Sequence, residues 1–84
     1  MTQTYVITFF SHYDAVQFSQ RAKKIGFDTK LMPVPRKISS SCGTGARCVV
    51  EERHDLSSLI EDGIDKIYLY DGNDYSLFYD VDSE

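Results

Sequence analysis

TYVITFF, residues 4–10, followed directly by Ser11, is the stretch that decides the fold class. Its β-branched and aromatic residues are typical of a buried strand. Ser11 is suited to cap a helix, with Asp14 three residues later as an acidic variant of the capping box. Gly26 is suited to end that helix. The apolar residues between them recur at helical spacing and predict one buried stripe, formed by Ala15, Phe18, Ala22 and Ile25.

The remaining chain alternates strand-like segments with turn signals. A second strand is expected in residues 27–34, ended by Pro33 and Pro35, which cannot donate to a ladder. Asp55 is predicted to cap a short helix that stops at Gly63. The turn signal Asp71-Gly72-Asn73-Asp74 predicts a hairpin. The other expected segments are a loop at 36–45 and strands at 46–51, 66–70 and 75–79.

This order predicts an α+β protein with a ferredoxin-like β-α-β-β-α-β sandwich and an extra C-terminal strand. One sheet would then carry both helices on one face. A chain of 84 residues has room for a single domain, 1–84. Residues 66–80 would form its C-terminal hairpin.

The charge distribution limits the classes of partner. The net charge is −4, and most cations precede residue 54. A globally acidic chain disfavours non-specific nucleic-acid binding, which needs a basic surface. No segment has the roughly 20 apolar residues that span a bilayer, and no secretory signal is evident. We therefore expect a cytoplasmic protein with reduced thiols, no nucleic-acid partner and no membrane partner.

Cys42 lies in the polar loop that precedes the third strand and is the main candidate for chemistry. A thiolate is the nucleophilic form of cysteine, and nearby cations and N–H donors favour it. Arg36, Lys37 and Arg47 can supply charge, and Gly43 and Gly45 allow an anion-binding nest of N–H groups. In the alternative interpretation, Cys42 is only a small residue in a flexible loop. Hydroxyl donors come from Ser39, Ser40 and Ser41.

Other candidate residues have simpler explanations. Cys48 falls inside the third strand and is interpreted as a core residue, although it could instead resolve an oxidised Cys42. His12 and His54 occur at helix starts, where solvated polar residues are usual. The tyrosines of the predicted hairpin favour cross-strand packing, with a homodimer as a further expectation.

Three sharper motifs are excluded. Only four residues separate Cys42 from Arg47, whereas the tyrosine-phosphatase loop needs five. Two cysteines cannot complete a tetrahedral zinc site. No Walker or dinucleotide glycine pattern is present. We therefore expect neither a metal nor a cofactor.

The stretch LMPVPRKISSSCG, residues 31–43, followed by Arg47, resembles a bacterial family of selenium/sulfur (Se/S) carrier-like proteins, formerly a domain of unknown function. The opening Tyr5-Val6-Ile7-Thr8-Phe9 and Asp14-Ala15 are also similar to that family. The resemblance covers about residues 4–63. It implies that Cys42 holds cargo as a persulfide or selenopersulfide, and Cys48 is not part of the signature.

The leading hypothesis is therefore a sulfur or selenium carrier rather than a free-standing enzyme. A donor enzyme would load the Cys42 thiolate, and an acceptor protein would receive the cargo. The anion would be stabilised by Arg36, Ser39, Ser40, Ser41, Gly43 and Arg47. The alternatives are a non-enzymatic module that binds an anion or a partner, and a redox sensor built from Cys42 and Cys48.

Overall fold

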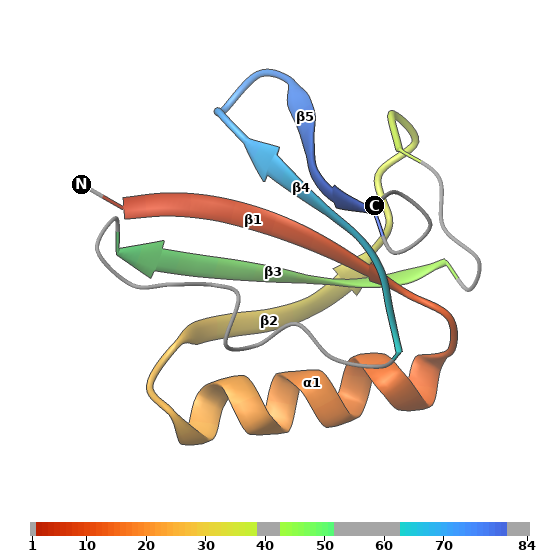
Figure 1. Ribbon diagram of the computed structural model, residues 1–84, viewed down its shortest axis with the longest axis vertical. Coiled ribbons are helices and arrows are strands. Elements are labelled where there is room, and N and C mark those ends of the chain that lie inside the picture. The colour runs from red at the N-terminus through yellow and green to blue at the C-terminus, as the bar shows by residue number, and fades with distance from the viewer. Residues whose placement is uncertain (1, 39–42, 52–62, 81–84) are drawn as a thin grey trace.

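The computed structural model describes residues 2–38, 43–51 and 63–80. These residues form strands and one helix, arranged as in Figure 1. In chain order the elements are β1 (Thr2–Phe9), α1 (His12–Lys24), β2 (Asp28–Pro33), β3 (Thr44–Glu51), β4 (Ile64–Tyr70) and β5 (Tyr75–Asp80). Each lies within about two residues of the segment that the sequence pattern predicts.

The strands form one sheet in the order β2-β3-β1-β4-β5, and every neighbouring pair is antiparallel. β1 lies at the centre, between β3 and β4. The predicted hairpin is present, because β5 pairs with β4 across the turn at 71–74 and sets Tyr70 opposite Tyr75. The sheet therefore ends in two edge strands, β2 and β5.

The predicted ferredoxin-like β-α-β-β-α-β sandwich is wrong. The described residues form a five-stranded antiparallel sheet with a single helix, so strands dominate the fold. The second helix was expected from Asp55 to Gly63, and residues 52–62 lie outside the described part of the chain. A segment of about two turns has too few apolar positions and hydrogen bonds to specify a helix by pattern alone.

α1 begins and ends where its capping residues predict. The Ser11 side chain accepts a hydrogen bond from the Asp14 N–H at 3.2 Å, and its hydroxyl donates to the Asp14 carboxylate at 2.8 Å. Gly26 follows the helix with a φ of 95°, a left-handed conformation that glycine adopts without a Cβ clash. Ile25 is exposed, so the buried stripe of the helix ends before it.

The core lies between α1 and one face of the sheet. α1 packs against β2, β3 and β1, as Figure 1 shows. Pairing sets Ile7 opposite Ala46 on β3 and Ile67 on β4, so these side chains share the helix-covered face. All three are buried in the same cluster as Phe9 and Phe18. The rings of Phe9 and Phe18 lie 5.4 Å apart between sheet and helix.

β1 is buried on its other face as well. Val6 and Thr8 point away from α1 by the alternation of the strand, yet both are buried, at 2% and 0% exposure. The Thr8 hydroxyl accepts from the Lys66 N–H at 3.0 Å and donates to the Lys66 carbonyl at 3.3 Å. These bonds occur where the register between β1 and β4 shifts. The second face of the sheet therefore has a cover of its own.

Gly63 directly precedes β4 and is hydrogen-bonded to Phe10, near the start of α1. Its carbonyl accepts from the Phe10 N–H at 3.1 Å, and its φ is 103°. A Cβ added here would lie 2.8 Å from the carboxylate of Asp14, which Ser11 already holds in place. Gly26 has a similar φ of 95°, but a Cβ there would meet no atom within 4 Å.

We predict that Gly63→Ala lowers the free energy of unfolding by about 1–2 kcal/mol more than Gly26→Ala does. Both substitutions force an L-residue into a left-handed conformation, but only the first adds a steric clash. Urea denaturation of the two variants measures the difference. Equal losses would show that Asp14 does not restrict position 63.

Candidate functional site

The connection between β2 and β3 is held together at its base. The β2-β3 ladder ends with Pro33 opposite Thr44. The Val34 N–H then donates to the Gly43 carbonyl at 3.0 Å, and the Ile38 N–H donates to the Pro35 carbonyl at 3.2 Å. Both ends of the loop are thus fixed by the sheet. Ser39, Ser40, Ser41 and Cys42 lie outside the described residues.

Val34 places the start of this loop against the sheet face opposite α1. A Cβ added to Gly45 would lie 3.3 Å from Val34 Cγ2 and 2.9 Å from the carbonyl oxygen of Ile7. Gly45 is buried within β3 and pairs with Thr8. Its absent side chain therefore makes room for Val34, which is a different role from the anion-binding nest considered for Gly45 from sequence.

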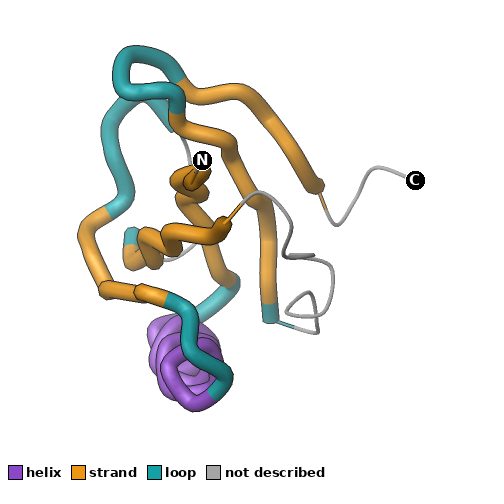
Figure 2. The backbone as a smooth tube through the Cα atoms, turned by 90° about the vertical axis from the view of Figure 1, so that its left-hand side faces the viewer, coloured by secondary structure: helices purple, strands orange, loops and turns teal. Residues whose placement is uncertain are grey.

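Lys37 ties the loop to the β4-β5 turn. Its ammonium donates to the Asn73 carbonyl at 3.1 Å and lies 3.5 Å from the Asp74 carboxylate. In Figure 2 the loop and the turn both lie on the side of the sheet away from the helix, and the Lys37 side chain spans the distance between them. We call residues 34–38 with this Lys37 contact the strap. Through Val34 the strap packs over Gly45, which is the β3 partner of Thr8.

Asp71 orders the turn that receives Lys37. Its Oδ1 accepts the N–H groups of Asp74 at 2.7 Å and Asn73 at 2.9 Å. The Asp71 N–H also donates to the Asp74 carbonyl at 3.2 Å. The N–H bonds to Oδ1, that of Asp74 first and that of Asn73 second, lower the pKa of the Asp71 carboxyl below its ordinary value. The carboxylate form of Asp71 is thus the form that holds the turn.

The predicted cations are exposed. Arg36 lies in the strap, and Arg47 lies on β3 with its side chain on the face away from α1. Within the described parts of the chain, neither side chain makes a hydrogen bond or ion pair. Gly43 has a φ of 74°, which glycine adopts readily. The roles of Arg36, Gly43 and Arg47 in stabilising an anion stay predictions.

One further residue, Lys30, was missed from the sequence, and another, His12, was interpreted only as a solvated residue at a helix start. Lys30 on β2 pairs directly with Arg47, so two cations stand side by side on the face that carries the strap. The His12 ring lies 3.3 Å from the Thr44 hydroxyl, which places this exposed histidine beside the end of the loop. Both placements depend on strand register and on the end of α1. Neither is readable from local spacing.

Cys48 is a core residue, as the sequence pattern indicates. It has no exposed surface and faces α1, and the Thr29 hydroxyl donates to its sulfur at 3.5 Å. Burial raises the pKa of its thiol, so the reactive thiolate is disfavoured. The sheet separates Cys48 from the face that carries the strap. This placement weakens the redox-sensor alternative, because a resolving cysteine must be accessible.

The hairpin tyrosines pack across strands. The rings of Tyr70 and Tyr75 stack 4.7 Å apart, at an interplanar angle of 26°. Tyr5 and Phe78 make an edge-to-face contact at 5.2 Å. Leu77 and Phe78 on the edge strand β5 are each more than half exposed. The predicted packing role is confirmed, and the homodimer stays a prediction.

Comparison with known proteins identifies one family. The family model described as "Putative Se/S carrier protein-like" matches residues 4–69, which include the loop and most of β4. No curated protein and no solved structure matches the chain. Among the described helical residues, none form a helix long and apolar enough to cross a membrane.

We predict that Lys37→Ala releases the strap. Exposed ion pairs contribute less than about 1 kcal/mol, so amide exchange at Val34 and Ile38 should accelerate about twofold to fivefold. Exchange within α1 should not change. Hydrogen exchange followed by NMR measures both. Lys24→Ala, which removes an equal charge from the helix, is the control. Unchanged protection at Val34 and Ile38 would mean that the Lys37 contact does not hold the loop.

We predict that Asp71→Asn flattens the acid limb of the stability curve. A carboxyl whose pKa is lowered by folding contributes stability above its unfolded pKa of about 3.9 and loses it as the pH falls through the lower folded value. The Asn side chain can still accept the turn's N–H groups but does not titrate. As the pH is lowered from about 5 to about 2, the variant should therefore lose less stability than the wild type. Thermal unfolding of both proteins measures this difference. A variant curve parallel to the wild type would contradict this assignment.

Proposed function

The chain belongs to the Se/S carrier protein-like family, and we propose that it carries sulfane sulfur or selenium on Cys42 and passes it to a partner. One observation carries the proposal above the others. The family match includes the whole loop that contains Cys42, and the bond from Val34 to Gly43 fixes the base of that loop against the sheet. A carrier needs its nucleophile presented to other proteins, and loops on a rigid scaffold serve that purpose.

The proposed loading step is a displacement at sulfur. Cys42 loses its proton, and its thiolate attacks the outer sulfur of a donor persulfide, R–S–SH. A new S–S bond forms on Cys42 while the S–S bond of the donor breaks. The donor leaves as a thiolate and takes up a proton. Delivery repeats the same displacement on the acceptor, and a selenopersulfide follows the same balance with selenium in place of the outer sulfur.

Positive charge near the loop supports this chemistry. A persulfide on Cys42 is anionic at neutral pH, and cations favour an anionic sulfur. Arg47 and Lys30 stand side by side, three or more residues from the nearer end of the loop, and Arg36 lies inside it. Like charges opposite one another on neighbouring strands repel. An anion bound between them would relieve that repulsion.

The same cations support a second candidate function. The exposed set Lys30, Arg36 and Arg47 would also suit a non-enzymatic module that binds an anion or an acidic partner. In that case Cys42 would be dispensable. Replacing Cys42 with Ser separates the two functions, because a binding module keeps its partner and a carrier loses all transfer.

We predict that the protein gains the mass of one sulfur atom when it is incubated with a cysteine desulfurase and cysteine. Mass spectrometry of the intact chain and its peptides should place the adduct on Cys42. Cys42→Ser should gain none. Cys48→Ala should still load, because its thiol is buried in the core.

Arg47→Gln should slow loading about threefold to tenfold, the change expected when loss of a nearby cation raises a thiol pKa by half a unit to one unit. Lys24→Gln, which removes a cation from the last turn of α1, is the matched control and should load at the wild-type rate. Failure of Cys42 to load, under conditions that load an established carrier, would refute the proposed function.

A further inference from the structure

The two edge strands of the sheet differ in how they are protected. The exposed residues of β2 are Asp28, Lys30 and Pro33. Charged side chains and proline are the usual devices by which an edge strand avoids pairing with another chain. β5 has neither between Tyr75 and Tyr79. β2 is therefore a guarded edge, whereas β5 presents its backbone as a template for a further strand.

β5 offers apolar side chains on both faces of this edge. Leu77 pairs with Tyr68, which lies on the face away from α1. The Phe78 ring contacts Tyr5, which belongs to the core on the helix side. Leu77 and Phe78 are each more than half exposed, and among the described strands none pairs with the outer side of β5. An added strand would cover both side chains and pair the backbone groups of the edge.

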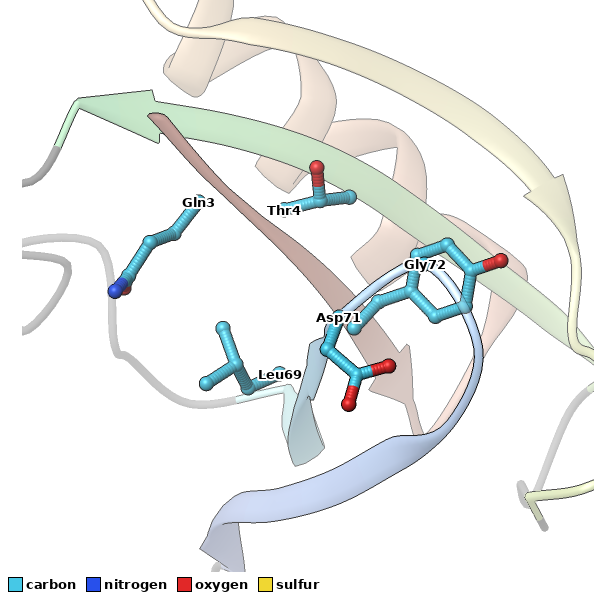
Figure 3. A pocket seen from close by; sticks show the side chains of 6 residues that line it. Gln3, Thr4, Leu69, Asp71 and Gly72 are labelled. Carbon is cyan, nitrogen blue, oxygen red and sulfur yellow. The ribbon is translucent and has the colours of Figure 1, made fainter. Parts of the chain in front are cut away.

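The start of β5 is held in place by the turn that precedes it. Figure 3 shows Asp71 where the chain turns from β4 toward β5. Its carboxylate accepts the N–H groups of Asn73 and Asp74. The stacked rings of Tyr70 and Tyr75 then join the first pair of the ladder. An edge that is already ordered loses little conformational entropy when a further strand binds to it.

Both ends of β5 carry a surplus of negative charge. At its start, Asp71 and Asp74 lie in the turn, and Lys37 is the described cation that contacts this turn. At its end, Lys66 lies opposite Asp80 and also contacts the carboxylate of its own chain neighbour at 3.3 Å. Within the described contacts, one lysine therefore faces two carboxylates at each end. The centre of the strand is uncharged.

We propose that β5 accepts an extended segment of a partner protein as a further strand, with apolar residues at its centre and a basic residue at each end. The basic residues would neutralise the surplus charge at the two ends, and the apolar ones would cover Leu77 and Phe78. A second copy of the chain fits less well, because its own β5 would bring the same negative charge to both ends. The site does not involve Cys42 and does not depend on the proposed carrier function.

The experiment uses the full ¹⁵N-labelled chain and the peptide acetyl-KTVTVTK-amide as the probe. The two lysines of the peptide have the same separation along the chain as Asp74 and Asp80. The amides of Ser76, Leu77 and Phe78 should shift saturably in an NMR titration, with a dissociation constant on the order of 0.1–1 mM. Acetyl-ETVTVTE-amide, which reverses the charges, should bind at least about fivefold more weakly at low salt.

Two variants provide the matched comparison. Leu77→Lys gives β5 the kind of guard that Lys30 gives β2, and it should weaken binding of the basic peptide at least about fivefold. Ile25→Lys is the control, because Ile25 is as exposed as Leu77, at 57% against 56%, but lies at the end of α1. It should change the dissociation constant by less than about twofold. The proposal is overturned if β5 shows no saturable shift, if the two peptides bind equally, or if Leu77→Lys has no effect.

Sedimentation equilibrium of the chain without peptide tests a second copy as the occupant of this edge. A monomer is expected at the protein concentration of the titration. A dimer that Leu77→Lys dissociates would show that β5 pairs with a second copy, and it would also overturn the proposal.

Discussion

The burial of β1 on both faces is the constraint on which the other features depend. Tyr5, Val6, Ile7, Thr8 and Phe9 form an unbroken buried run at the centre of the sheet. α1 covers only the face to which Ile7 and Phe9 belong. The other face must be protected by something else, because an exposed Val6 would forgo the free energy of burying its side chain. The strap provides part of that protection beside Thr8, where Val34 packs over Gly45.

This double burial links the fold to the candidate site. Val34 can approach the sheet only because position 45 is glycine, and Lys37 reaches the turn that Asp71 orders. The loop that contains Cys42 therefore starts from a fixed platform and returns to the sheet through Gly43. In the proposed function, the contacts that pack this face of the sheet would also fix the base of the loop that presents Cys42. A nucleophile can then be offered to partners without a deep cleft, which a chain of this size has little room to build.

Local signals predicted the elements well and their assembly less well. Ser11, Asp14 and Gly26 mark the ends of α1 through hydrogen bonds between near neighbours, and the turn at 71–74 marks the hairpin in the same way. The error was the two-helix sandwich, which relied on a short apolar pattern around Leu56 and Leu59.

The register between neighbouring strands could not be predicted from the sequence. The pairing of Lys30 with Arg47 and the contact of His12 with Thr44 both join segments that are distant in the sequence. The burial of Cys48 follows from simpler reasoning, since strand alternation alone places this residue in the core.

The reactivity of Cys42 at neutral pH is the central claim, and the pH dependence of its alkylation measures it most directly. Iodoacetamide labelling of the Cys48→Ala variant reports on Cys42 alone. We expect an apparent thiol pKa clearly below the value of about 8.5 for free cysteine, and a rise in that pKa when Arg47 is replaced by Gln. An apparent pKa at or above that of free cysteine, unaffected by Arg47, would contradict the account and leave the loop without a thiolate to carry cargo.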